Sequence, residues 1–140
     1  MKGPGKVVII VAVVILILFT ASIAVRFTRD DPQKIYRRNC NIRVEVLNGC
    51  GVNRLALRIT DLLREQGFNV VSVGVTHKDS FPETVVLERS DLSLTNANYF
   101  AKRIGCKNIG QDVDPALYID VTLIVGADYR KIFPDVEKKF

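Results

Sequence analysis

The chain has 140 residues, a hydrophobic fraction of 48% and a formal net charge of +5. Once an apolar N-terminal segment and its linker are set aside, this length leaves material for one domain of ordinary size. All of the excess positive charge lies within residues 1–38, and the remainder carries 13 basic and 13 acidic residues without a basic and aromatic stripe. We therefore expect no nucleic-acid partner.

The first candidate element is apolar and lies near the N-terminus. Residues 7–25 contain no charged side chain, and their only polar ones are Thr20 and Ser22. A helix of this length covers about 28 Å, close to the hydrocarbon thickness of a bilayer. The sequence predicts a basic N-terminus over residues 1–6, a transmembrane helix over 7–25 and a basic linker over 26–40. The linker is interpreted as a solvated tether, with contact to anionic lipid headgroups as the alternative.

A cleaved signal peptide is the rival interpretation of this segment. Lys2 and Lys6 form a short basic region, and Ser22 and Ala24 form a pair of small residues of the kind found at cleavage sites. Apolar residues nevertheless continue to Val25 without the polar, turn-forming stretch that usually precedes cleavage. Retention as a membrane anchor is favoured.

Beyond the linker, residue periodicity predicts a β-α-β-β-α-β order. Strands are expected where apolar residues alternate with polar ones or where β-branched residues cluster, and helices where apolar residues recur at three-and-four spacing. The strands are 42–46, 70–75, 84–88 and 119–125, and the helical stripes are 52–63 and 97–104. The expected fold is an α/β two-layer sandwich of ferredoxin-like arrangement over residues 41–129. An additional short strand near Ile109 and a polar tail over 130–140 complete the prediction.

Two motifs at the ends of this region point to a family. The residues VEVLNGCG occupy 44–51 and are followed by Leu55-Ala56, and DVTLIVGADY occupies 120–129. In order and spacing they resemble the LytR C-terminal domain, which occurs at the C-terminus of LytR/CpsA/Psr envelope proteins and also alone behind one membrane helix. The loop after Gly51 departs from the pattern, because Val52-Asn53-Arg54 stands where the family often has another small residue.

The resemblance implies a bacterial cell-envelope protein. The larger relatives attach glycopolymers to peptidoglycan through a separate catalytic domain, for which about a hundred residues after the linker leave no room. We therefore expect a single-pass membrane protein with a non-catalytic accessory or binding module for a cell-wall glycopolymer or an envelope partner protein. No cofactor is expected.

The orientation in the membrane is predicted in opposite directions by two arguments. Five basic residues of the linker follow the apolar segment, whereas only Lys2, Lys6 and the amino terminus precede it. The positive-inside rule would leave the domain in the cytoplasm. The resemblance implies that it lies outside, and we follow the resemblance in expecting an extracytoplasmic domain.

Five residues are candidates for ligand binding: Asn48, Gly49, Gly51, Asp120 and Asp128. The glycine-rich loop enters a helix and its N–H groups could hold an anion, but no Lys-Thr or Lys-Ser pair follows as in a nucleotide-binding loop. A tight strand-to-helix turn is the alternative. For the two aspartates the alternative is structural, either an outward strand position or an Asx-type hydrogen bond.

The cysteines allow two further hypotheses. Cys50 could act as a nucleophile with His77 as its base, which would make the domain a small thiol-dependent hydrolase or transferase, although no third orienting residue is indicated. Cys50 and Cys106 could instead form a disulfide, because the expected element order brings both to one end of the fold in an oxidising compartment. Three free thiols are the alternative, since Cys40 leaves the count odd. The scattered cysteines and single histidine predict no metal site.

Overall fold

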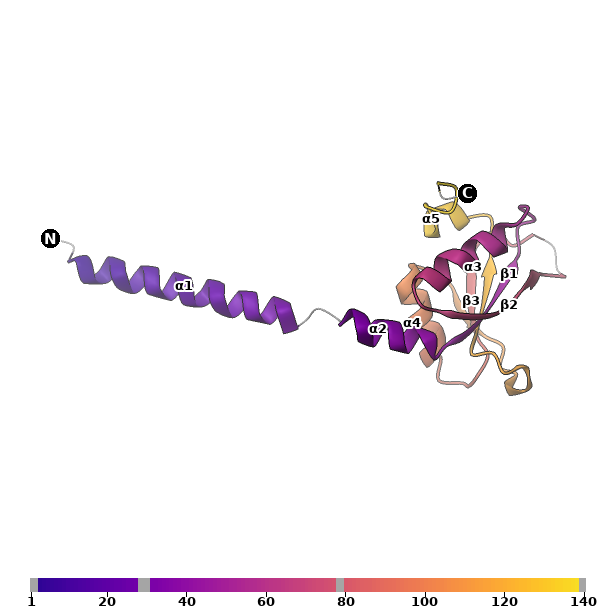
Figure 1. Cartoon of the computed structure of the whole chain (residues 1–140), viewed down its shortest axis with the longest axis horizontal. Coiled ribbons are helices and arrows are strands. Elements are labelled where there is room, and N and C mark those ends of the chain that lie inside the picture. Colours follow the sequence, from indigo (N-terminus) through magenta and orange to yellow (C-terminus); the bar gives the residue numbers. More distant parts are fainter. Residues whose placement is uncertain (1–2, 28–30, 78–79, 139–140) are drawn as a thin grey trace. The chain divides into compact units, whose positions relative to one another are not determined.

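The computed structural model describes residues 3–27, 31–77 and 80–138, so the expectations for Lys2, for Arg29 and for the last two residues of the tail lie outside the described residues. The chain forms two compact units, Met1–Ile35 and Tyr36–Phe140. In the first unit, helix α1 spans Pro4–Phe27 (Figure 1). Its stretch Pro4–Arg26 has a mean hydropathy of 3.2 and is long and apolar enough to cross a membrane. A signal sequence would share these properties, so retention of the segment stays a prediction.

The end of the linker is part of the folded domain. Helix α2 spans Pro32–Cys40, and its Asn39 is only 1% exposed. The Asn39 Nδ2 donates a hydrogen bond to the Gln66 carbonyl at 2.6 Å, and the Tyr99 hydroxyl donates to Asn39 Oδ1 at 2.8 Å. The Arg38 guanidinium lies 3.8 Å from the centre of the Tyr99 ring. The expected solvated tether is thus wrong for these last residues, because a buried amide and a cation–π contact attach them to the domain.

The expected elements of the domain are present. Strand β1 spans Arg43–Asn48, helix α3 Leu55–Glu65, strand β2 Asn69–Val75, strand β3 Val85–Glu88 and helix α4 Thr95–Ile104. They are followed by the short strand β4 at Ile109–Gln111, a 3₁₀ turn η1 at Pro115–Leu117, strand β5 at Val121–Val125 and helix α5 at Tyr129–Ile132. The short strand near Ile109 is therefore confirmed.

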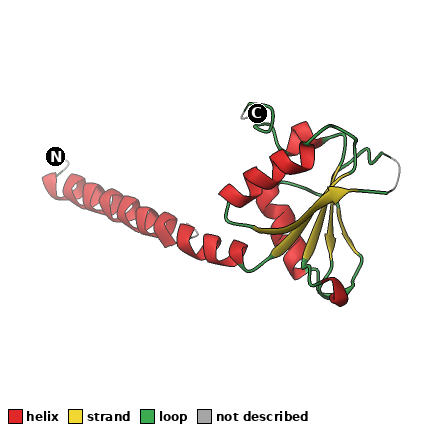
Figure 2. Cartoon of the chain, turned by 45° about the vertical axis from the view of Figure 1, so that its right-hand side comes forward, coloured by secondary structure: helices red, strands yellow, loops and turns green. Residues whose placement is uncertain are grey.

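The sheet has the order β2-β1-β5-β3-β4. Strand β1 pairs in parallel with both β2 and β5, and β3 runs antiparallel to β5 and parallel to β4. The two-layer α/β architecture is confirmed, and Figure 2 shows the two long helices of the domain, α3 and α4, on one side of the sheet. The ferredoxin-like arrangement is not confirmed, because it requires an antiparallel strand between β1 and β2. Here α3 returns the chain directly to the neighbouring position, and the last strand takes the other side of β1.

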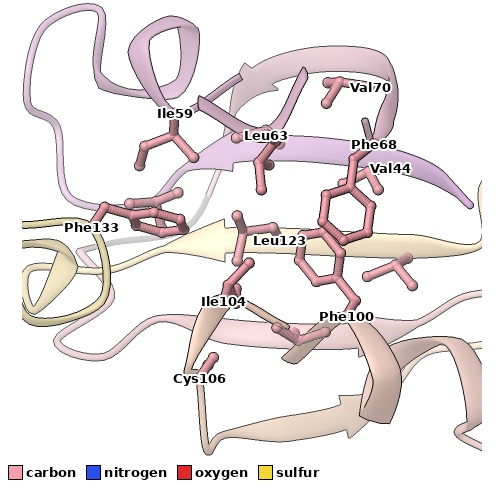
Figure 3. Close-up of a cluster of buried hydrophobic side chains, with 14 of the residues drawn as sticks. Val44, Ile59, Leu63, Phe68, Val70, Phe100, Ile104, Cys106, Leu123 and Phe133 are labelled. Carbon is pink, nitrogen blue, oxygen red and sulfur yellow. The ribbon is translucent and has the colours of Figure 1, made fainter. Parts of the chain in front are cut away.

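The core lies between the sheet and the two helices α3 and α4. It contains the inward residues of the strands together with the apolar stripes of both helices, and the Phe68 and Phe100 rings meet edge to face at 4.8 Å between centroids (Figure 3). The expected polar tail also contributes, since Phe133 and Val136 are 6% and 1% exposed. These two apolar side chains, three residues apart in a charged stretch, pack into the core and attach the tail to the domain. The compact unit therefore continues past residue 129.

Candidate binding surface on the open face of the sheet

The strands present two different faces. In β1, Val44 and Val46 are fully buried under the helices, whereas Glu45 and Leu47 alternate with them and are partly exposed. Neighbouring strands continue this second face, which no described helix covers. It is hollowed into a cleft of about 640 Å³. The cleft is lined by Glu45, Leu47, Val75, Thr76, His77, Phe81, Val85, Leu87, Arg89, Asp112, Thr122 and Ile124.

The floor of the cleft is aliphatic. Leu47, Val85, Leu87 and Ile124 come from the three central strands β1, β3 and β5, and the Phe81 side chain is added by the loop between β2 and β3. Strands that are covered on both faces carry apolar side chains on both, as in parallel sheets whose crossover helices lie on each side. This floor has the composition of a covered sheet face without the covering layer.

The carboxylate of Glu45 lies beside this aliphatic floor. Glu45 Oε1 accepts a hydrogen bond from the Ser72 hydroxyl at 3.2 Å, and Oε2 accepts one from the Thr122 hydroxyl at 3.0 Å. Both donors are the direct neighbours of Glu45 in the strand register. The charge of Glu45 is thus stabilised within the sheet, so each of its oxygens already has a partner in the free protein.

An ion pair also borders the cleft. The Arg89 Nη1 contacts Asp112 Oδ2, and the two side chains are 12% and 69% exposed. Arg89 Nε is the one buried side-chain nitrogen or oxygen without a hydrogen-bond partner among the described residues. His77 adds an exposed imidazole to the same lining. The charged groups of the lining are therefore few: Arg89 is paired with Asp112, and Glu45 is a second carboxylate.

The predicted loop residues serve the turn between β1 and α3. Asn48 Nδ2 donates to the Val52 carbonyl at 2.7 Å, and Asn48 Oδ1 accepts from the Cys50 N–H at 3.2 Å. A Cβ on Gly49 would lie 2.9 Å from the Val125 carbonyl oxygen, and Gly51 has a φ of +73°. Gly49 is needed because the chain passes close to β5, and Gly51 is needed because its backbone is left-handed. These contacts support the tight-turn alternative, and a ligand role for the three residues stays a prediction.

Asp120 joins the starts of β1 and β5. Its Oδ2 accepts from the Arg43 N–H at 2.8 Å, and its Oδ1 accepts from the Arg43 Nη2 at 2.8 Å. Burial raises the pKa of Asp120, but the hydrogen bonds and charge of Arg43 outweigh it and hold the pKa below its usual value. The same pairing raises the pKa of Arg43. Both carboxylate oxygens of Asp120 therefore already have hydrogen-bond partners within the chain, and ligand binding by Asp120 stays a prediction.

Asp128, beyond the other end of β5, also has hydrogen-bond partners within the chain. Its Oδ1 accepts hydrogen bonds from both the N–H and the hydroxyl of Thr84, each at 2.7 Å. The Thr84 hydroxyl oxygen in turn accepts from the Gly126 N–H at 3.1 Å. This network fixes the turn after β5 against the start of β3, and ligand binding by Asp128 stays a prediction.

The cysteines are separate in the structure. Cys40, Cys50 and Cys106 are free thiols in the structure, as in the alternative of three free thiols, and the Cys50–Cys106 disulfide stays a prediction. The Cys106 thiol is buried and donates to the Thr84 carbonyl at 3.4 Å, and burial raises its pKa. Cys50 donates to Asn48 Oδ1 at 3.6 Å and packs against the core. His77, its hypothetical base, lines the cleft, and Cys50 is not among the lining residues.

Metal ligands are not assembled in the described part of the chain, where no three His, Cys, Asp or Glu side chains are grouped to hold an ion.

The open face itself was not identified from the sequence. A signal was present, because Val85 and Leu87 of β3 and Ile124 of β5 are apolar in addition to the core positions of these strands, which is typical of a sheet apolar on both faces. These apolar runs are short, so they predicted strands but did not indicate that one face of the sheet has no covering layer.

A family profile places this domain among known proteins. The profile of the family described as LytR cell envelope-related transcriptional attenuator matches residues 41–129. A solved structure, the solution structure of the C-terminal domain of RV0431, is 23% identical and has a TM-score of 0.39, covering 62% of this chain and 73% of that one. No curated protein matches the chain.

Proposed function

Because this chain belongs to the family of the LytR cell envelope-related transcriptional attenuator domain, we propose that it is a membrane-anchored, extracytoplasmic and non-catalytic module that binds an envelope partner protein. The apolar helix α1 is the anchor. The open sheet face is the binding surface. The observation that carries this proposal is the aliphatic cleft of about 640 Å³ on a face that no described helix covers.

The lining of the cleft favours a protein over a glycopolymer. A glycan presents many hydroxyl groups, and each one that leaves water on binding needs a hydrogen bond in return. The floor made by Leu47, Leu87 and Ile124 offers none, and Glu45 is already bonded through both oxygens. An apolar side of a protein element loses only ordered water on the same floor. The occupant that fits is therefore an apolar protein surface with few charges.

A non-catalytic role is supported by the positions of the residues that could react. The Cys50 thiol donates to its neighbour Asn48 and packs on the core side, whereas His77 lines the cleft. A thiol nucleophile needs its base within hydrogen-bond reach. The alternative of a hydrolase or transferase using Cys50 gains no support from this arrangement.

Photocrosslinking in intact cells tests the binding surface. Phe81 is replaced by p-benzoylphenylalanine, which keeps an aromatic side chain in the cleft lining. We expect a discrete crosslinked protein from this position and none from the same replacement of Tyr118, which directly follows η1, is 75% exposed and is not among the lining residues. Crosslinks to purified sacculi would favour the glycopolymer instead and contradict the proposed partner class.

A second substitution makes the crosslink specific to the cleft. Leu87→Asp places a charge on the aliphatic floor and should abolish the crosslink from position 81. The matched control is Leu57→Asp on α3, where the side chain is already 49% exposed and lies outside the cleft lining. Loss of the crosslink in both variants, or retention in both, would overturn the open face as the binding surface. Loss of envelope function in Cys50→Ala would favour the enzyme.

A further inference from the structure

The two edges of the sheet differ in how well they are protected. The β4 edge is three residues long, whereas the β2 edge runs over Asn69–Val75 and contains neither a charged residue nor a proline. Folded proteins normally shorten or charge an exposed edge, because its backbone groups pair readily with another chain. The β2 edge is therefore the one suited to strand addition.

Protection is also uneven along β2 itself. The register with β1 shifts after Val70, where Val71 is the extra residue of a bulge. Before the bulge, Arg64 Nη2 donates to the Val70 carbonyl at 3.3 Å. After the bulge the strand is regular and no described strand lies on its outer side. The segment from Ser72 onward is the part open to a partner.

The register identifies which backbone groups face outward. Val73 and Val75 are the partners of Val46 and Asn48, and the Thr76 N–H donates to the Asn48 carbonyl at 3.1 Å. In a parallel ladder, alternate residues of a strand direct their N–H and C=O groups toward the neighbour. Gly74 and Thr76 therefore face β1, and the N–H and C=O groups of Val73 and Val75 face outward.

We propose that β2 pairs antiparallel with β2 of a second copy of this chain, about a two-fold axis at Gly74. In this register Val73 lies opposite Val75 of the second copy, and the outward groups of the two residues are those that an antiparallel hydrogen-bonded pair exchanges. The valine side chains, 38% and 66% exposed in one chain, cover each other. The two strands approach most closely at Gly74, where neither copy has a side chain.

A second copy fits this edge better than a peptide of unrelated sequence for three reasons. The register is self-complementary, with valine opposite valine on one face and Ser72 opposite Thr76 on the other. The segment carries no charge that would repel an identical strand. Anchoring in one bilayer also raises the effective concentration of copies for each other.

Substitution of the opposed valines tests the register in the full chain. The chain is labelled with donor or acceptor dyes at the exposed Cys40, in a Cys50→Ser background, and energy transfer is followed in lipid vesicles at increasing chain-to-lipid ratio. Val75→Lys should raise the apparent dissociation constant of the dimer about tenfold or more, because it affects two symmetry-related cross-strand pairs. Circular dichroism and thermal melting verify that the variant is folded.

The double variant Val73→Glu/Val75→Lys should recover the dimer, because the proposed register places each glutamate opposite a lysine. Ile109→Lys on the β4 edge is the matched control and should leave association unchanged. The proposal is overturned if the unsubstituted chain stays monomeric. It is equally overturned if Val75→Lys still dimerises, if the double variant does not recover, or if the β4 control weakens association as much.

Discussion

The two faces of the sheet are built from the same strands but differ in how deeply their side chains are buried. The helix-covered face holds fully buried side chains such as Val44, Val86 and Leu123, against which Phe100 of α4 packs, while the open face leaves Leu47 and Leu87 partly exposed. Apolar side chains stabilise a fold in proportion to the area they remove from water. Stability should therefore depend on the covered face, and binding on the open one.

The largest expected difference between the faces is in large-to-small substitution. Phe100→Ala removes a ring that is fully buried and meets the Phe68 ring edge to face, and should lower the free energy of unfolding by about 3–5 kcal/mol. Leu87→Ala on the open face should cost well under half as much, because part of that side chain is already solvated. Urea titration of the detergent-solubilised chain measures both. Equal losses would mean that the open face is also a core.

A smaller contrast is expected between two glutamates. Glu88 is fully buried, and its carboxylate accepts from the Ala97 N–H at 2.7 Å and from the Ser90 hydroxyl at 2.6 Å. Glu88→Ala would leave a helix N–H of α4 without a partner and should cost about 2–3 kcal/mol. Glu45→Ala should cost under about 1 kcal/mol, because its hydroxyl donors can turn to water in the cleft. Thermal unfolding of the two variants distinguishes them.

The smallest expected effect is a pH dependence that arises from the Arg43–Asp120 ion pair. The pKa of Asp120 is lower in the folded chain than its usual value, so its contribution to stability is complete above about pH 4 and is lost as pH falls through the folded pKa. In Asp120→Asn the free energy of unfolding should therefore fall less as the pH is lowered, so that this acid limb of its pH dependence is flatter. The exposed carboxylate of Asp61 on α3 provides the control, and Asp61→Asn should keep the limb. An unchanged limb in Asp120→Asn would contradict the assignment.

Local structure was largely predictable from the sequence because it depends on residue spacing. Alternation over 42–46 and 119–125 corresponds to β1 and β5, and the helical stripe ending at Gly105 corresponds to α4, whose C-cap glycine has a φ of +78°. Strand order was not predictable in the same way. It depends on which strands pair across the chain, and the β-α-β-β-α-β order is compatible with more than one sheet.

The functional surface was harder to predict than the fold for a related reason. Asn48, Asp120 and Asp128 attract attention as polar residues in apolar surroundings, but each is bonded within the chain. The cleft is made of aliphatic residues that look like core residues until the sheet is seen to lack one layer. Asn39 was missed for the opposite reason, because its partners Gln66 and Tyr99 are distant in sequence.

The side of the membrane on which the domain lies decides whether the open face can meet an envelope partner at all. Alkaline phosphatase fused after Phe140 is active only where its disulfides form, outside the cytoplasm, whereas a cytoplasmic reporter at the same position gives the complementary signal. We expect an active phosphatase fusion and an inactive cytoplasmic reporter. An inactive phosphatase together with an active cytoplasmic reporter would place the domain in the cytoplasm, as the basic linker alone suggests, and would contradict the envelope function.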